Sequence, residues 1–466
     1  MKKDNEFLGT APIGRLLFKL AIPTIAAQLI NMLYNVVDRI YIGHLDGVGD
    51  LALTGLGVCM PIIMIISAFA ALVGAGGAPR ASIFMGKGDK VSAERTMGSC
   101  FILQIFVSVI LTVLLLIFHE PLLLAFGASE NTVVYAADYL KIYSIGTIFV
   151  ETTLGMNAYI TAQGFAREGM STVMIGAILN IILDPIFIYG FDMGVKGAAV
   201  ATVISQCVSC IWVLLFLFGK KSVLRLSGDA LLFRPALTLP CLALGLAPFI
   251  MQASESVISV AFNSSLLKHG GDIAVGAMTI LTSVMQLALL PLQGLAQGAQ
   301  PIISYSFGQK NSERVRKTVR LLMIVSVSYS TLFFLLIMLF PRAFAGIFTP
   351  DEALLNFTAP VLRIYCLMLG IFGIQVAAQM TFVSLGKALS SVAVAVMRKF
   401  VLLLPLIYLM PALLTDKVTA IYLAEPIADF LSVTFTVILF FFQWRRVMRS
   451  IRLREHNPAP SKPNIQ

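Results

Sequence analysis

Residues 298–318 read GAQPIISYSFGQKNSERVRKT, and residues 77–96 read GAPRASIFMGKGDKVSAERT, so the later stretch restates the earlier one. Within them Gly86 matches Gly308 at an offset of 222 residues. Self-similarity at a fixed spacing indicates an internal structural repeat. The chain of 466 residues is therefore expected to contain two copies of one unit, each about half its length.

The repeat extends well beyond this stretch. The same offset carries LKIY at 140–143 onto LRIY at 362–365. Near the start of each copy the offset is 225, and there Asp38 falls on Asn263. Three residues missing from one loop reconcile the two offsets. The copies thus match over their whole length but differ at an acidic position.

Composition predicts that both copies lie in a membrane. Hydrophobic residues make up 58% of the chain and charged residues 12%, whereas a soluble protein is roughly a quarter charged. Stretches of about 20 apolar residues recur, and each is long enough to cross ~30 Å of hydrocarbon as a helix. We predict an all-α integral membrane protein with twelve spans, at 15–43, 51–78, 96–118, 132–155, 161–189, 195–219, 236–266, 273–302, 317–340, 354–382, 388–413 and 419–444.

Basic residues are distributed unevenly between the two sets of loops. Most of the 34 Lys and Arg residues lie on the side of the termini, and the opposite loops hold only Lys196, Lys268, Arg342 and Lys417. This bias predicts a multi-pass cell-membrane protein with both termini cytoplasmic, and it accounts for the net charge of +10 without a nucleic-acid partner. Six spans per copy give both copies the same orientation, an arrangement of parallel repeats found in secondary transporters.

The sequence predicts two six-helix bundles with a linker and a tail. We expect an N-lobe at 1–220, a basic and polar cytoplasmic connecting loop at 221–235, and a C-lobe at 236–450. Residues 451–466 are rich in proline and polar residues, and we expect a disordered cytoplasmic tail there. The fused repeat supplies both halves of a pathway in one chain, so we expect a monomer in membrane lipid.

Several functional classes lack support in this sequence. No GxxxxGK[ST] motif is present, so ATP is not the expected source of energy. No nucleophile–base pair or metal-binding cluster of residues suggests an enzyme, and no cofactor is expected. A channel would ordinarily form its pore by oligomerisation, which the fused repeat makes unnecessary.

Polar residues inside the spans mark a candidate coupling site. The first span reads INMLYNVVDRIYIG, which puts Asn31, Asn35 and Asp38 on one helix face. The fifth reads GAILNIILDPIFIYGF, which does the same for Asn180 and Asp184. Ionisable residues in spans are costly and are functional candidates by default. Two carboxylates facing each other in a low dielectric should not both ionise, so they should bind a proton or share a cation.

Local chemistry supports a cation here, although a structural alternative exists. Pro185 cannot donate to the carbonyl of Ile181, and such a free oxygen suits a hard cation such as Na⁺. Alternatively, Asp38 forms an interfacial ion pair near Arg39, and Asn180 and Asp184 form a structural polar group with Asn157 or Tyr139.

These motifs carry a family resemblance. The pattern NxxxNxxDxxxxG from Asn31 to Gly43, with LNIILDPIFIYGFDMGVKGAA at 179–199, resembles the multidrug and toxic compound extrusion (MATE) family, in its MepA-like bacterial branch. The resemblance covers essentially the whole chain. It implies a V-shaped, twelve-helix transporter that exports organic cations in exchange for H⁺ or Na⁺. It also implies a cation site at Asp38, Asn180, Asp184 and Thr202, with Tyr139 and Asn157 nearby; Asp38 and Asp184 would ligate a metal ion only if the coupling ion is Na⁺.

The C-lobe departs from this pattern. The position of Asp184 falls near Leu406, and no acidic partner is evident in the tenth span. Glu255 resembles a C-lobe glutamate of related family members, and Gln252 lies three residues earlier on the same face. We expect Glu255, with Gln252 beside it, to attract substrate or to form a second cation site; the alternative is a glutamate that only faces the pore. Glu425 and Asp429 form another i, i+4 pair, which the sequence assigns neither to function nor to structure.

The sequence therefore predicts an ion-coupled antiporter that exports amphipathic, often cationic, drugs across the plasma membrane by alternating access. The main alternative is a flippase for lipid-linked saccharides with a related fold. Such a flippase would favour Arg and Lys in its cavity to bind pyrophosphate, whereas intramembrane bases are few here. The choice between H⁺ and Na⁺ stays open.

Overall fold

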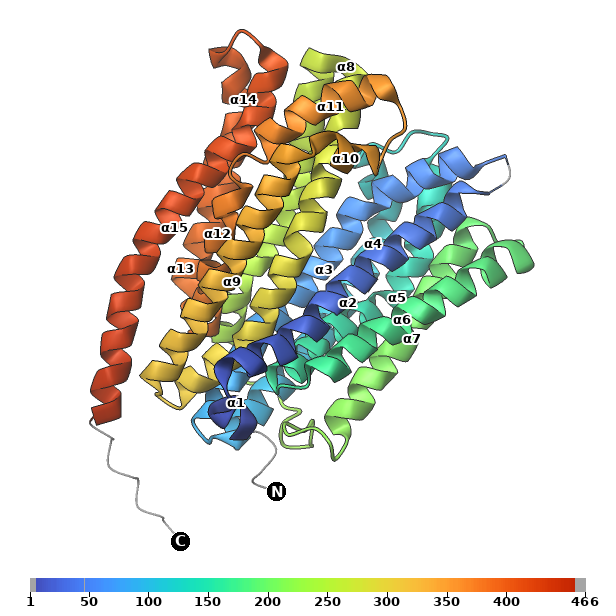
Figure 1. Cartoon of the computed structure of the whole chain (residues 1–466). Helices are drawn as coiled ribbons and strands as arrows, with labels where there is room; N and C mark the ends of the chain where they lie inside the picture. The colour runs from blue at the N-terminus through green and yellow to red at the C-terminus, as the bar shows by residue number, and fades with distance from the viewer. Residues whose placement is uncertain (1–5, 46, 457–466) are drawn as a thin grey trace.

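The computed structural model describes residues 6–45 and 47–456, and over these residues it contains helices and no strand (Figure 1). The N-terminal half comprises α1 (Glu6–Thr10), α2 (Ile13–Gly43), α3 (Gly49–Gly86), α4 (Lys90–Ala125), α5 (Val133–Ala162), α6 (Ala166–Pro185), the π-helix η1 (Ile186–Gly190) and α7 (Val195–Phe218). The C-terminal half comprises α8 (Pro235–Gly308), α9 (Ser312–Leu339), α10 (Pro341–Gly346), α11 (Glu352–Tyr365), α12 (Leu369–Ser384), α13 (Ala388–Val396), the π-helix η2 (Met397–Leu403), α14 (Leu404–Leu413) and α15 (Lys417–His456).

Each of the twelve predicted spans has a helical counterpart. Ten helices of the described chain are long and apolar enough to cross a membrane, and the pair α11–α12, bent by 51°, makes an eleventh. The 74-residue α8 contains two spans, because Gly271 (φ 66°) breaks its helical course. The predicted all-α membrane fold of two six-helix bundles is confirmed.

Most helices extend beyond the predicted spans, and two of the differing boundaries concern specific expectations. Gly164 (φ 92°) forms a turn that ends α5, so the fifth span begins at Ala166 rather than at 161. At the other end α15 continues to His456, past the expected start of the tail at 451. Residues 457–466, the rest of that tail, lie outside the described residues.

The two copies build the same local structures from the repeated stretch. Asp89 caps α4 by accepting a hydrogen bond from the Ser92 backbone N–H at 2.9 Å. Its equivalent, Asn311, caps α9 by accepting from the Arg314 N–H at 2.9 Å. Both side-chain oxygens satisfy N–H groups that a helix start leaves without partners. The two copies are therefore similar in structure as well as in sequence.

The repeated glycines bring the two lobes together. A Cβ on Gly86 would lie 2.1 Å from the carbonyl oxygen of Tyr305, and one on Gly308 would lie 2.2 Å from that of Ile83. Ile83 and Tyr305 are themselves equivalents in the repeat. Each lobe thus offers the same glycine to the same carbonyl of the other lobe, as a pseudo-twofold axis between parallel repeats requires.

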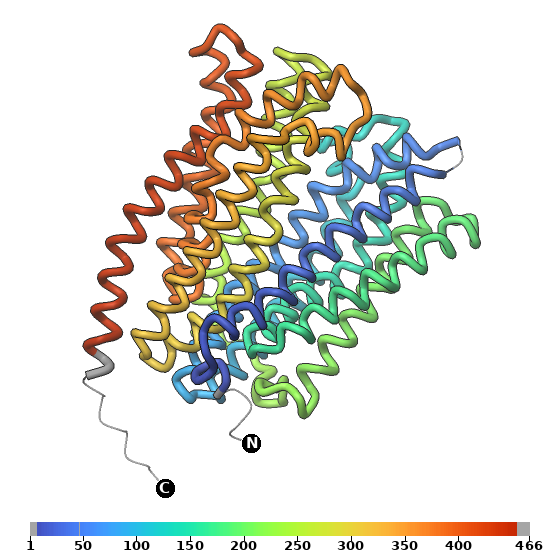
Figure 2. Tube along the Cα trace, in the orientation of Figure 1, coloured from blue at the N-terminus to red at the C-terminus, as the bar shows by residue number. Residues whose placement is uncertain are grey.

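The distribution of the core shows where the lobes join and where they separate. One buried apolar cluster includes Leu17, Val73, Ile302 and Val447 and so contains residues from both lobes. A second cluster lies entirely in the C-lobe and a third entirely in the N-lobe. Figure 1 and Figure 2 show the two bundles side by side, and the cluster common to both contains residues near the two ends of the chain, such as Leu8 and Ile451. The lobes therefore share a core near the chain termini and have separate cores beyond it, which gives the V shape.

Contacts between α3 and α8 follow the same division. Gly76 packs against Cys241 and Gly245, and farther along Ser256 Oγ lies 3.5 Å from the Pro61 carbonyl oxygen. Beyond this point Gly57 has nothing within 4 Å of where its Cβ would be. The two helices thus diverge toward the end opposite the termini.

Candidate cation and substrate sites

Four polar residues from three helices meet in the N-lobe. Asn180 on α6 donates through Nδ2 to Asp184 Oδ1 at 3.0 Å and to Thr202 Oγ1 on α7 at 3.3 Å. Asp38 on α2 lies within electrostatic range of Asp184. None of the four is more than 8% exposed. The structure therefore brings together the carboxylates that the sequence placed on separate helices.

Three oxygen atoms of this site have no hydrogen-bond partner among the described residues. They are Asp38 Oδ1, Asn180 Oδ1 and Asp184 Oδ2, and all three are buried. Buried polar atoms in proteins are nearly always hydrogen-bonded, so each exception calls for an explanation. Three acceptors without donors suit a proton or a cation. Asp38 is buried at 8% exposure, which disfavours the interfacial alternative, although the charge of Arg39 still acts on it.

Tyrosine side chains surround the carboxylates. The ring of Tyr139 is buried beside Asp38, with its hydroxyl near Thr202, and it stacks on Tyr143 with the ring centroids 6.0 Å apart. Tyr34, which the sequence analysis did not select, lies near both acids. Buried tyrosine side chains therefore lie in the neighbourhood of both carboxylates.

A π-helical turn links Asp184 to the helix that carries Asp38. It follows Pro185, and α7 approaches it closely, because a Cβ on Gly197 would lie 2.7 Å from the Phe187 carbonyl oxygen. From the same turn Tyr189 donates its hydroxyl to the Tyr41 carbonyl on α2 at 2.7 Å. Turns of this kind are often found at functional sites. The turn that follows Asp184 is therefore linked to α2 by the hydrogen bond from Tyr189.

Three residues expected to support the site lie elsewhere or bond elsewhere. Asn157 donates to the Gly169 carbonyl at 3.2 Å, and it is separated from Tyr139 by 18 residues of α5, or about 27 Å along a helix. The expectation that Asn157 lies near the carboxylates is therefore wrong. Asn35 donates to the carbonyl of Asn31 on its own helix at 2.7 Å, and Asn31 is exposed.

Sequence reasoning overlooked a fully buried carboxyl group in the N-lobe. Glu151 on α5 is 0% exposed and accepts a hydrogen bond from Gln104 Nε2 on α4. Glu151 Oε1 and Gln104 Oε1 have no partner among the described residues. The signal was available, since Glu151 lies inside the predicted fourth span, where any ionisable residue is a candidate.

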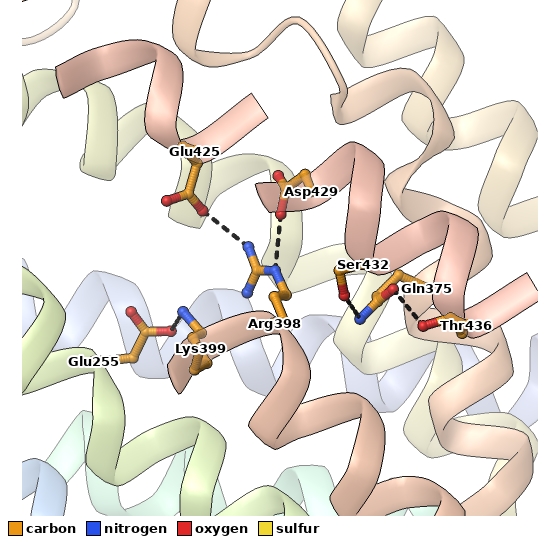
Figure 3. Close-up of polar contacts among 8 residues, drawn as sticks. All are labelled: Glu255, Gln375, Arg398, Lys399, Glu425, Asp429, Ser432 and Thr436. Carbon is orange, nitrogen blue, oxygen red and sulfur yellow. Dashed lines mark hydrogen bonds and ion pairs between the residues drawn. The ribbon is translucent and has the colours of Figure 1, made fainter. Parts of the chain in front are cut away.

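The C-lobe carries a network of charged side chains (Figure 3). Lys399 donates through Nζ to Glu255 Oε1 at 2.6 Å, and the lysine side chain is 3% exposed while that of the glutamate is 50% exposed. An approaching solute can therefore reach the carboxylate of Glu255, whereas Lys399 is enclosed. Gln252, three residues earlier on α8, is also exposed.

The neighbouring Arg398 accounts for the pair that the sequence left unassigned. Its Nη2 donates to Glu425 Oε1 at 2.9 Å and its Nε to Asp429 Oδ1 at 2.8 Å. The guanidinium also lies over the Phe372 ring, 4.6 Å from its centroid. Glu425 and Asp429 thus hold a buried cation in place. The tenth span, which has no evident acidic partner for Glu255, contains Gln375 on α12. This glutamine forms hydrogen bonds with Ser432 and Thr436.

The fold and these sites define a class of protein. The protein consists of two parallel repeats of membrane helices that are joined at one end, and each lobe carries buried polar residues. This is the architecture of secondary transporters. The described residues contain no cluster of three or more His, Cys, Asp or Glu that would hold a metal ion.

Comparison with known proteins assigns the family. The MatE family profile matches residues 23–186 and 248–409, one segment in each lobe, and the chain belongs to this family. It is therefore a multi-pass membrane transporter and not an enzyme.

Named relatives match over nearly their whole length. The chain is 23% identical to the multidrug export protein MepA of Staphylococcus haemolyticus, over 92% of this chain and 95% of the relative. It is 25% identical to an FAD transporter of Shewanella oneidensis, over 92% and 94%. Among solved structures, a MATE in the bent conformation superposes with a TM-score of 0.89 at 22% identity, covering 98% and 100%. An outward-facing MATE transporter gives 0.88 at 23% identity, covering 97% and 99%.

Proposed function

We propose that this protein is an antiporter that exports amphipathic, cationic drugs in exchange for H⁺ or Na⁺. The observation that carries the proposal is the N-lobe site, where three buried acceptor oxygens on Asp38, Asn180 and Asp184 lack donors. A cation or proton bound there supplies the missing positive charge. The relatives named as multidrug export proteins support drugs as the cargo.

The proposed cycle is alternating access between two arrangements of the lobes. In the present arrangement the lobes touch near the termini and diverge at the far end. With cytoplasmic termini, as the basic residues predict, this arrangement faces outward. Drug leaves as Asp38 and Asp184 acquire the coupling ion, and the lobes then rock to release that ion inside. Each elementary charge moving inward gains about 2.3 kcal/mol per 100 mV of membrane potential.

Glu255 and Gln252 are the proposed contacts for cargo in the C-lobe. The carboxylate of Glu255 is half exposed, so an organic cation can reach it even though Lys399 contacts it from the buried side. Gln252 adds a neutral polar group one turn away on the same helix. Thr202 and Tyr139 are proposed to belong to the ion site instead, because both lie beside the N-lobe carboxylates.

We propose that the protein works as a monomer and binds anionic lipid at its termini end. A cavity of about 480 Å³ there is lined by α9 and α15 residues that combine basic and apolar groups: Arg316, Trp444, Arg445, Met448, Arg449, Arg452 and Leu453. Basic pockets between helices on the cytoplasmic side suit anionic headgroups.

The alternative function is a flippase or carrier for a cargo that contains pyrophosphate. The relative named as an FAD transporter suggests FAD as a particular cargo of this kind. Such a cargo needs unpaired basic side chains. In this chain Arg398 and Lys399 already contact carboxylates, which favours a cationic cargo.

Replacement of the N-lobe carboxylates tests the proposal. Asp184→Asn and Asp38→Asn should each abolish efflux of ethidium from cells while leaving the amount of protein in the membrane unchanged. Undiminished efflux in either variant would contradict the coupling role. Drug-driven pH change in sodium-free proteoliposomes distinguishes the two ions, since an Na⁺-coupled protein should produce none. If the wild-type protein exports no cation but carries FAD, the alternative replaces the proposal.

A further inference from the structure

We propose that Lys399 is a tethered competitor for Glu255: it neutralises this carboxylate when no cargo is bound and moves to Glu425 when the positive group of a cargo takes its place. The inference rests on the drug-export function proposed above and specifies how the C-lobe recognises its cargo. It assigns a role in specificity to Lys399 and Glu425, for which the sequence provided none.

The first step is the asymmetry of the Glu255–Lys399 pair. The Lys399 side chain is 3% exposed and so almost fully buried, whereas half of the Glu255 side chain is exposed (Figure 3). A cargo cation can therefore reach the carboxylate from the open side while the ammonium holds it from behind. Two cations on one carboxylate repel each other, so binding of the cargo weakens the hold of Lys399.

The second step is that a displaced Lys399 needs another acceptor. A buried ammonium without a partner is too costly to persist, so displacement requires a carboxylate within reach. Glu425 lies within electrostatic range of Lys399 and uses Oε1 for its bond to Arg398. Arg398 itself is fixed by two carboxylates and by the Phe372 ring. Of the two adjacent bases, Lys399 is thus the one with a single ion-pair partner and the one that can move.

The third step is the charge balance of the network in Figure 3. Three acids, namely Glu255, Glu425 and Asp429, face two bases, Arg398 and Lys399. With all five ionised the network carries one net negative charge. One added monovalent cation balances it, whereas a divalent cargo leaves an unbalanced positive charge in a buried region. The geometry therefore favours organic monocations, such as protonated amines or quaternary ammonium compounds.

The local backbone fits a moving lysine. Arg398 and Lys399 are consecutive residues in η2, the π-helical turn that interrupts the eleventh span between α13 and α14. Its wider turn carries one residue more than an α-helical turn, and such insertions often occur at functional sites. The two bases consequently point to different partners from neighbouring positions (Figure 3).

Direct binding of ethidium, a permanent monocation, tests the competition. With purified protein in lipid nanodiscs, Lys399→Met should bind ethidium about tenfold more tightly than wild type, since the competitor is gone. Glu255→Gln should weaken binding by a similar factor. Lys141→Met is the matched control, because Lys141 is an exposed lysine inside a span of the other lobe, and its loss should leave ethidium affinity unchanged. Unchanged or weaker binding by Lys399→Met would overturn the proposal.

A double-mutant cycle tests the second position of Lys399. Glu425→Gln removes the alternative acceptor, so it should weaken ethidium binding several-fold in the wild-type background and clearly less in the Lys399→Met background, where only the loss of one negative charge remains. Equal effects in both backgrounds would refute the movement of Lys399, even if Glu255 proves to bind cargo. Failure of the wild-type protein to bind any organic cation would instead refute the proposed function, and this inference with it.

Discussion

Gly245→Ala should shift the equilibrium between the two arrangements of the lobes. A Cβ on Gly245 of α8 would lie 1.8 Å from the carbonyl oxygen of Leu72 on α3, and Cβ atoms essentially never approach closer than 3.0 Å. The atom it meets belongs to the backbone, so no side-chain rotation relieves the overlap. The two helices must therefore separate by at least about 1.2 Å at the end where the lobes share a core.

The cost of this separation follows from the behaviour of overpacked cores. Adding a methyl group where backbones touch costs about 1–3 kcal/mol. The overlap exists only while the lobes are closed at this end, so the penalty favours the opposite arrangement by roughly 5- to 150-fold. Alanine also favours the helix over glycine by about 1 kcal/mol, but it does so in both arrangements and this gain cancels.

The rate at which Cys241 is alkylated measures the shift. Cys241 is fully buried on α8, one turn before Gly245, and its carbonyl contacts Gly76. In a variant that keeps only this cysteine of the six, Gly245→Ala should speed reaction with N-ethylmaleimide by roughly 5- to 150-fold.

Two alanine variants serve as controls for that experiment. Gly57→Ala on α3 meets open space, and Gly276→Ala on α8 meets the Leu354 side chain at an ordinary 3.5 Å. Neither should change the rate for Cys241. If Gly245→Ala reacts no faster than these controls, the glycine contact does not set the equilibrium and the reasoning fails.

Three further predictions concern stability, and thermal melting of the purified protein measures each. Hydrogen bonds from Ser92 hold the pKa of Asp89 below its usual range, so this helix cap stabilises the fold at neutral pH and loses that effect as the pH falls. Asp89→Ala should therefore lower the free energy of unfolding by about 1 kcal/mol at pH 7 and by less in acid. Asn311→Ala removes a cap that does not ionise, so it should lower the free energy of unfolding equally at both pH values. Gly271→Ala should lower the free energy of unfolding by about 1–3 kcal/mol, because the φ of 66° and ψ of −163° at position 271 are accessible only to glycine. Arg314→Lys should lower the free energy of unfolding by about 1 kcal/mol, because Nε and Nη2 of the arginine both donate to the Leu8 carbonyl and lysine cannot make both bonds. A melting temperature equal to that of the wild type would contradict the prediction for the variant concerned.

Part of the N-lobe site was predictable because its signals are local. Asp38 and Asp184 stand out as acids inside apolar spans, and the motifs around them resemble those of a known family. Glu151 carried the same local signal and was overlooked. Asn157 was misplaced because a position within a span does not indicate its depth relative to residues on other helices, and about 27 Å of α5 separate it from Tyr139.

The C-lobe network depended on contacts that no local pattern reveals. Lys399 and Glu255 are 144 residues apart, and Arg398 meets Glu425 and Asp429 across 27 and 31 residues. Each of these residues is conspicuous in a span, yet their pairing follows from the packing of α8, η2 and α15. The pairing changes their interpretation, since Glu425 and Asp429 hold an internal arginine and Glu255 is already occupied by a lysine.

The sequence by itself determined the repeat, the number of spans and the helical class, because lipid requires every backbone group in a span to be bonded within that span. Which buried charges meet was decided only by the tertiary structure. A charge in a low dielectric persists only beside its counter-charge, and the three-dimensional arrangement of the helices alone determines which counter-charge lies within reach.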